Sequence, residues 1–235
     1  MRGRSLLGSG RTSPANLTTM TYSVKEIYYT LQGEGANSGR AAVFLRFSGC
    51  NLWTGLEKDR HKGPGGCSMW CDTNFVGVDG PGGGKFQSAA ELVEAVKSHW
   101  PSSVGRGVKP LVVCTGGEPM LQLDAELIEL LSRAGFDLAA ETNGTIAPPP
   151  GPLWVTVSPK AGTKLKISRG NELKLVFPQR HVDPSDYEGL DFDFFYLQPL
   201  DNENQKDNLK AALDYCLANP KWRLGLQAHK YVGIP

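Results

Sequence analysis

Three cysteines are the residues of this chain whose type and spacing point most directly to chemistry. Cys50, Cys67 and Cys71 follow an apolar stretch, with sixteen residues between the first two and three between the last two. The five cysteines of the chain are odd in number and irregularly placed, which indicates a reducing, cytoplasmic compartment, where clustered thiolates usually bind a metal. A structural zinc or an ordinary iron–sulfur cluster takes four protein ligands. Three thiolates therefore predict a metal centre with one position open for another ligand.

The turn Thr115-Gly116-Gly117-Glu118-Pro119 is the second element with chemical potential. Glycines let backbone amides approach a ligand closely, and a carboxylate accepts charge-assisted hydrogen bonds from an ammonium group. Beside a three-thiolate centre, Gly117 and Glu118 would suit a ligand that carries an amine. Taken alone, the same turn also suits a connection from a strand to a helix, so a purely structural role stays open.

Short apolar strands alternate with helices along the rest of the chain, which predicts a parallel sheet wound by βα units. One helix has Ser88 in the N-cap position and Glu91 in the capping-box position. We expect strands at 22–29, 41–47, 111–114, 138–141, 153–157, 173–177, 194–197 and 222–227, and helices at 88–100, 122–134 and 206–218.

Polar and turn-forming residues occupy the carboxyl ends of these strands. Glu141 ends one strand, Ser158 and Lys160 follow the next, Gln198 follows a later one and His229 comes after the last. In α/β barrels this end of the strands is the active-site face. Because six strands end in this way, one shared ligand site is favoured.

Composition and charge exclude several function classes. The 235 residues are 40% hydrophobic and 21% charged, which suits an enzyme with one sizeable core. A net charge of +1 favours neither nucleic acid nor a membrane surface as a partner, and no apolar run is long enough to cross a bilayer. Residues 1–19 carry Arg and Ser but no acid, which predicts a disordered N-terminal tail before one domain over 20–235.

These motifs together resemble those of radical S-adenosylmethionine enzymes and, more narrowly, of the 7-carboxy-7-deazaguanine synthase family. The resemblance runs from Met20 to Pro235. It implies an α/β fold, a partial and incomplete parallel β/α barrel of about six strands. Beyond the cysteines and the glycine-rich turn, the stretches that carry the resemblance are 26–35, 47–53, 71–73, 141–144 and 229–235.

The resemblance also implies the reaction. A 4Fe–4S cluster on Cys50, Cys67 and Cys71 would cleave S-adenosylmethionine to methionine and a 5′-deoxyadenosyl radical. That radical would abstract hydrogen from 6-carboxy-5,6,7,8-tetrahydropterin, and ring contraction with loss of ammonia would give 7-carboxy-7-deazaguanine, a queuosine precursor. Further implied features are Mg²⁺, a reductant such as flavodoxin or ferredoxin, and a homodimer.

Residue roles follow from the resemblance position by position. A planar, always charged guanidinium such as that of Arg46 suits the substrate carboxylate. The carboxylate of Glu34 and the α-carboxylate of Pro235 suit the N–H edge of a pterin. Thr73 would place a hydroxyl on Mg²⁺. The S-adenosylmethionine site would comprise Trp70, Gly117, Glu118, Glu141, Ser158, Lys160 and Gln198, and the substrate site Leu31, Gly33, Glu34, Arg46, Thr115, His229 and Pro235.

Other interpretations remain open at this point. Arg46 would also suit an ion pair with an acid, His229 a satisfied core position and Thr73 a turn cap. A non-catalytic zinc module would use His61 as the fourth ligand beside the three cysteines. A radical S-adenosylmethionine activase of a glycyl-radical enzyme would act on a protein partner, with no use for Glu34, Arg46 or Pro235.

Overall fold

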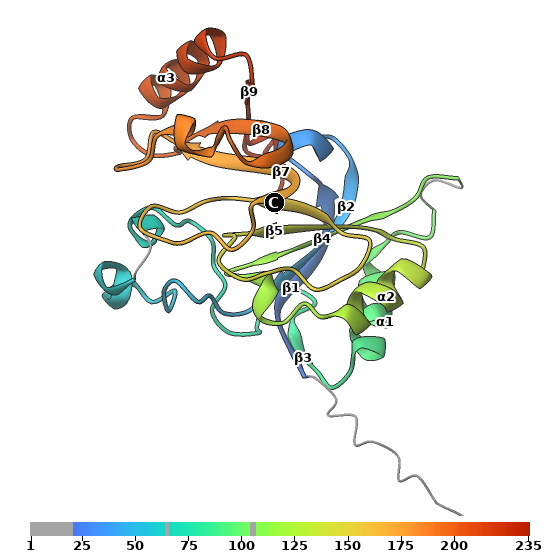
Figure 1. The fold of residues 1–235 in the computed structure, drawn as a ribbon. Coiled ribbons are helices and arrows are strands. Elements are labelled where there is room, and N and C mark those ends of the chain that lie inside the picture. Colours follow the sequence, from blue (N-terminus) through green and yellow to red (C-terminus); the bar gives the residue numbers. More distant parts are fainter. Residues whose placement is uncertain (1–20, 64–65, 104–106) are drawn as a thin grey trace, which may run out of the picture.

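The computed structural model describes residues 21–63, 66–103 and 107–235 of the chain (Figure 1). The predicted N-terminal tail over 1–19 lies outside the described residues. Among the helices that the model does describe, none has both the length and the apolar character that crossing a membrane requires.

One mixed β-sheet organises the described residues, with the strand order β3-β1-β2-β4-β5-β6-β7-β8-β9. Strands β2 and β4 to β9 run parallel to one another, whereas β1 pairs antiparallel with both β2 and β3. The sheet is open, because its edge strands β3 and β9 do not pair with each other. The strands are β1 (Tyr22–Leu31), β2 (Ala41–Phe47), β3 (Gly84–Phe86), β4 (Leu111–Gly116), β5 (Asp137–Thr142), β6 (Trp154–Val157), β7 (Arg169–Phe177), β8 (Asp191–Pro199) and β9 (Trp222–Leu224).

Helices α1 and α2 pack against each other beside β1 and β5, and α3 packs on β8 and β9 (Figure 1). The α-helices are α1 (Ala89–His99), α2 (Ala125–Arg133), α3 (Gln205–Ala218) and α4 (Ala228–Val232). Short 3₁₀-helices are η1 (Gly35–Asn37), η2 (Glu57–Lys62), η3 (Gly66–Met69), η4 (Pro119–Leu121) and η5 (Pro184–Tyr187).

The prediction for α1 is confirmed. The Ser88 hydroxyl accepts a 3.2 Å hydrogen bond from the Glu91 amide, and Leu92, Val93 and Val96 are buried on the inner face. Helix α2 begins later than predicted, at Ala125, because Asp124 is its N-cap and accepts a 2.9 Å hydrogen bond from the amide of Leu127.

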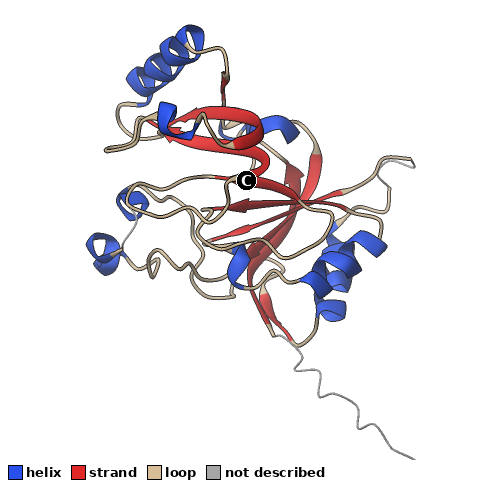
Figure 2. Ribbon diagram, in the orientation of Figure 1, coloured by secondary structure: helices blue, strands red, loops and turns tan. Residues whose placement is uncertain are grey.

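The strand count and the connections differ from the prediction. The described sheet has nine strands: the eight expected segments and β3, which is too short to show a pattern, so the count of about six that the resemblance implied is not confirmed. Residues 143–153 and 158–168, all described, contain no helix, so β5, β6 and β7 are joined by loops instead of βα units (Figure 2). The run Pro148-Pro149-Pro150 explains the first of these loops, since proline interrupts a helix.

Two groups of buried apolar side chains support the two halves of the sheet. One lies between β1, β2, β4, β5 and helices α1 and α2, and the other lies between β6 to β9 and α3. Each fully buried leucine or valine stabilises this arrangement by roughly 1.5–3 kcal/mol. The strand ends, and the polar residues on them, are therefore fixed from both sides of the site.

Candidate active site

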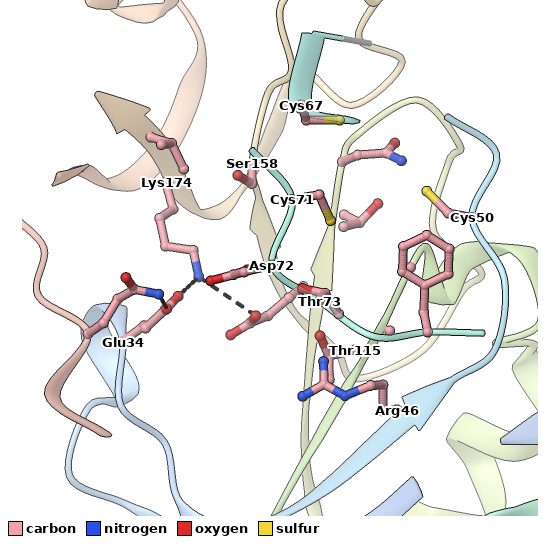
Figure 3. Close-up of a pocket in the computed structure, with 18 of the residues that line it drawn as sticks. Glu34, Arg46, Cys50, Cys67, Cys71, Asp72, Thr73, Thr115, Ser158 and Lys174 are labelled. Carbon is pink, nitrogen blue, oxygen red and sulfur yellow. Dashed lines mark hydrogen bonds and ion pairs between the residues drawn. The ribbon is translucent and has the colours of Figure 1, made fainter. Parts of the chain in front are cut away.

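A cavity of about 360 Å³ lies at the carboxyl ends of the parallel strands (Figure 3). Its wall combines the ends of β2, β4, β5, β7 and β8 with the cysteine-bearing loops and the C-terminal segment. The structure thus brings most of the sequence-predicted site residues to one place. Those that line it are Leu31, Glu34, Arg46, Cys50, Cys67, Trp70, Cys71, Thr73, Thr115, Gly117, Glu141, Ser158, Lys160, Gln198, His229 and Pro235.

The three clustered cysteines are free thiols that face the same space from separate segments (Figure 3). Cys50 follows the end of β2, Cys67 is buried in η3, and Cys71 comes after that turn. Burial raises the pKa of Cys50, and it raises that of Cys67 to about 11. Burial therefore favours the protonated form of these two thiols, and binding of a metal would replace their protons.

The spacing of the thiols bears on the kind of metal. Within the described part of the chain, no three His, Cys, Asp or Glu side chains converge closely enough to hold a single ion. A tetrahedral zinc needs such convergence on one point, whereas each thiolate of an iron–sulfur cluster binds a different iron. His61, in η2, is also absent from the cavity wall. The predicted fourth ligand of the Cys₃His zinc alternative therefore does not lie in this cavity wall.

The glycines of the turn after β4 allow it to pack on the loop that carries Cys50. A Cβ on Gly117 would lie 2.7 Å from the Cβ of Cys50, and a Cβ on Gly116, whose φ is +143°, would lie 2.9 Å from the backbone nitrogen of Phe47. The amide of Glu118 donates a 3.0 Å hydrogen bond to the carbonyl of Gly49. The turn is therefore fixed against the cysteine loop with no room for side chains.

Glu118 does not occupy the place that the sequence suggested. It is fully buried, is not part of the cavity wall, and accepts hydrogen bonds from the Met120 amide at 3.0 Å, the Thr142 hydroxyl at 2.7 Å and the Asn143 amide at 2.8 Å. Burial raises the pKa of Glu118, although these donors oppose the shift. Its carboxylate thus satisfies the donors of two buried turns.

Gly33 is the other predicted residue that the cavity wall lacks. Its carbonyl accepts a 2.9 Å hydrogen bond from the Ala228 amide, and a Cβ at this position would collide with the His229 side chain. Gly33 therefore acts through its small size, which leaves room for His229 in the cavity wall.

Lys174 is a cavity residue that the sequence analysis missed. Its ammonium pairs with the carboxylate of Glu34 and lies 3.7 Å from Oε2 of Glu141 (Figure 3). The amides of Gln198 and Gln227 also donate to Glu34, at 3.2 and 3.0 Å. A signal existed, because a lysine interrupts the otherwise apolar stretch 173–177. Other lining residues outside the predicted set are Tyr28, Gln32, Phe44, Leu52, Trp53, Asp72, Phe75, Gly116, Thr142, Asn143, Val176 and Lys230.

Arg46 forms an ion pair with an acid, as the sequence left open, and also lines the cavity. Its Nε donates to Glu26 at 2.7 Å and its Nη2 to the Tyr28 hydroxyl at 2.9 Å, both from the neighbouring strand β1. The guanidinium nevertheless lines the cavity. The ion pair with Glu26 therefore fixes its direction and leaves other N–H donors for a ligand.

An aromatic residue and a lysine meet on another part of the cavity wall. The Lys160 ammonium lies 5.2 Å from the ring centroid of Trp70 and donates a 2.7 Å hydrogen bond to the Ser158 hydroxyl. Burial lowers the pKa of Lys160. These contacts bring the loop after β6 against the cysteine loop.

The C-terminal segment closes one side of the cavity. Helix α4 brings His229 to the wall, and the Thr30 hydroxyl donates a 3.0 Å hydrogen bond to an oxygen of Pro235. Lys230 pairs with Asp72, at 3.1 Å, and with Asp201. The segment is thus attached both to β1 and to the residue after Cys71.

Comparison with known proteins identifies the family. No family model matches the chain. It is 55% identical to the 7-carboxy-7-deazaguanine synthase of Nitratidesulfovibrio vulgaris and 54% identical to that of Caulobacter vibrioides, in each case over 92% of this chain and all of the relative. The synthase of Escherichia coli is 33% identical at the same coverage.

The fold agrees with a solved relative. The crystal structure of QueE from Escherichia coli superposes with a TM-score of 0.64 and 27% identity, covering 89% of this chain and 95% of that one. Identity above one half over nearly the whole chain, joined to a shared fold, leads to one conclusion: the chain is an enzyme that belongs to the 7-carboxy-7-deazaguanine synthase family.

Proposed function

We propose that this enzyme uses a 4Fe–4S cluster and S-adenosylmethionine to convert 6-carboxy-5,6,7,8-tetrahydropterin to 7-carboxy-7-deazaguanine with loss of ammonia, on a radical S-adenosylmethionine type of partial barrel. One observation carries the proposal. Three free thiols, an arginine and two glutamates from distant parts of the chain line a single cavity at the strand ends.

The donor set fits a cluster bound by three thiolates. Cys50, Cys67 and Cys71 are free and face one cavity, and the side chain that Gly117 lacks would meet Cys50. When bound, the reduced cluster supplies the electron that cleaves S-adenosylmethionine to methionine and a radical able to abstract hydrogen. The backbone of Gly117 borders the space beside the thiols, where the amino acid portion of that cofactor is expected.

The polar groups of the wall fit the rest of S-adenosylmethionine. Oε1 of Gln198 is buried and, within the described residues, has no hydrogen-bond partner, so it is available to accept from a ligand. We assign Glu141 and Ser158 to the ribose and adenine, and the Trp70 ring to a stacking or edge contact. Glu118 acts indirectly, through the two turns that it holds.

Charge and shape support the pterin assignment. Arg46 would bind the substrate carboxylate in the forked geometry that a guanidinium favours. Glu34 and the α-carboxylate of Pro235 would accept hydrogen bonds from the N–H edge of the pterin ring, with Thr115 and His229 completing its contacts. Leu31 would cover an apolar part of the ring.

Three further features belong to the proposal. The hydroxyl of Thr73, which lines the cavity, would bind Mg²⁺ near the substrate, because hard cations prefer oxygen ligands. A small electron-transfer protein such as flavodoxin or ferredoxin would reduce the cluster. The active enzyme would be a homodimer.

An anaerobic turnover assay tests the proposal. Reconstituted enzyme is incubated with reductant, S-adenosylmethionine and 6-carboxytetrahydropterin, and 7-carboxy-7-deazaguanine is followed by mass spectrometry. We expect product from the wild type and none from Cys71→Ala. Cleavage of S-adenosylmethionine without a deazapurine product would overturn the substrate assignment and favour an activase, whereas a colourless protein that binds only zinc would overturn the radical chemistry.

A further inference from the structure

Lys174 is a buried residue of the cavity wall and has no part in the proposed chemistry. Its side chain is 7% exposed, and its ammonium faces the carboxylates of Glu34, on the substrate side, and Glu141, on the S-adenosylmethionine side. We propose that Lys174 is a positioning residue that, by pairing with both carboxylates, holds one toward each of the two ligands. This inference rests on the proposed function.

The two residues that carry these carboxylates are linked twice, which supports a shared role. The first link is Lys174 itself. The second is Gln32, whose amide nitrogen donates to Oε1 of Glu141 at 2.9 Å and whose amide oxygen accepts from the backbone of Glu34 at 3.1 Å. Lys174 thus joins the two carboxylates, and Gln32 joins the Glu141 carboxylate to the main chain of Glu34, so the two residues are held relative to each other.

The balance of charge shows why a cation is needed at this point. Three carboxylates, of Glu34, Glu141 and Glu172, act on Lys174 from strands or loops that are far apart in sequence. The other cationic or titratable groups nearby are Lys160, whose ammonium contacts Trp70 and Ser158, and His229, which acts on Glu34. Without Lys174, the Glu34 carboxylate would face those of Glu141 and the buried Glu172 with less compensation, and like charges in such a space favour protonation of Glu34.

The electrostatic directions agree with this geometry. Burial would raise the pKa of Glu34, but the charge and hydrogen bond of Lys174, together with the amide of Gln227, hold it below the usual value. Burial would lower the pKa of Lys174, but Glu141, Glu34 and Glu172 raise it. Lysine and glutamate are therefore both ionised in the folded enzyme.

Removal of Lys174 should change the pH dependence of substrate binding in one defined direction. In Lys174→Met the folded-state pKa of Glu34 rises, so Glu34 becomes protonated at a higher pH than in the wild type. A protonated carboxyl accepts the N–H edge of a pterin less well, because a charge-assisted pair becomes a neutral one. Substrate affinity should thus fall near neutral pH and recover as the pH rises.

Binding to the reconstituted holoenzyme tests this prediction without turnover. Affinities for 6-carboxypterin, a stable oxidised analogue, and for S-adenosylmethionine are measured anaerobically by calorimetry over a range of pH. We expect Lys174→Met to weaken both ligands by about 10- to 100-fold at neutral pH. The pH below which the affinity for the pterin falls should be higher in Lys174→Met than in the wild type. Lys174→Arg, which keeps the charge, should return this pH toward the wild-type value.

A matched control is available in Lys25. Its side chain is 9% exposed and pairs with Asp79 at 2.6 Å, but it does not line the cavity. Lys25→Met removes a comparably buried lysine and should leave both affinities and their pH dependence unchanged. A pH-independent loss of affinity in Lys174→Met, or no loss, would overturn the inference.

A double variant covers the case in which Lys174→Met does not fold. Lys174→Met with Glu34→Gln leaves no unpaired acid at position 34. We expect this double variant to bind the pterin weakly and to lose the fall in affinity that the wild type shows at low pH. If the double variant still showed that fall in affinity at low pH, the inference would be overturned. A wild-type enzyme that binds neither ligand would overturn the proposed function itself, whereas normal binding by every Lys174 variant would overturn this inference alone.

Discussion

The Thr142 hydroxyl donates a 2.7 Å hydrogen bond to the buried carboxylate of Glu118. This bond joins the turn after β4 to the end of β5, and the Asn143 amide strengthens the connection at 2.8 Å. The same turn contacts the loop of Cys50 through Gly117. A residue that resembles a direct cofactor ligand in sequence is therefore the link that holds two walls of the cavity together.

The first prediction concerns Glu118→Gln. An amide has one acceptor oxygen where the carboxylate has two, so at least one buried donor loses its partner. We expect the free energy of unfolding to fall by about 1–3 kcal/mol, measured by denaturant titration of the cluster-free protein. Glu126→Gln, on the exposed first turn of α2, should change it little. An unchanged stability with weaker S-adenosylmethionine binding would contradict this structural role.

The second prediction separates the five cysteines. Cys50→Ala, Cys67→Ala and Cys71→Ala should each lose bound iron, sulfide and visible absorbance after anaerobic reconstitution, because every thiolate binds its own iron. Cys114→Ala and Cys216→Ala should retain all three, since Cys114 is buried within β4 and Cys216 lies on α3. Full iron content in Cys67→Ala would show that the cluster uses a different ligand.

Local features of the sequence predicted local structure well. The N-cap Ser88 and the apolar spacing of α1 depend on neighbouring residues, and β2 was predicted with the bounds that it has, Ala41–Phe47. Gathering of the strand-end residues at one cavity was also predictable, because the carboxyl ends of parallel strands share one edge of a sheet.

Features that depend on distant partners were not predictable in this way. Strand β1 has an ordinary strand pattern, which does not show its direction in the sheet. Its pairing with β2 shows that it runs antiparallel. The inward direction of Glu118 depends on donors 24 and 25 positions away. The burial of Lys174 depends on Glu34, 140 positions away, whose charge offsets the cost of desolvating an ammonium.

The third prediction concerns Arg46. Arg46→Gln keeps a polar side chain and removes the charge, so the KM for 6-carboxytetrahydropterin should rise by about 10- to 100-fold. Binding of S-adenosylmethionine should change little, because the proposed contacts of Arg46 are with the substrate carboxylate. Steady-state kinetics and calorimetry measure the two effects separately.

Arg40 provides the control for that experiment. It pairs with Asp137 at 2.9 Å and is not part of the cavity wall. Arg40→Gln should leave the KM for the pterin unchanged. Equal effects of the two substitutions, or a loss of S-adenosylmethionine binding in Arg46→Gln, would rule out a specific contact with the substrate.

The fourth prediction concerns Pro235, which lines the cavity and accepts a hydrogen bond from the Thr30 hydroxyl. Deletion of Pro235 shortens the segment and withdraws its carboxylate from the proposed pterin edge, so pterin affinity should fall by about tenfold or more. The deletion leaves the ion pairs of Lys230 with Asp72 and Asp201 intact, and these should keep α4 in place. Thr30→Val, which removes only the hydroxyl that donates to Pro235, should have a smaller effect in the same direction. Calorimetry with 6-carboxypterin measures both, and an unchanged affinity after the deletion would exclude Pro235 from the substrate site.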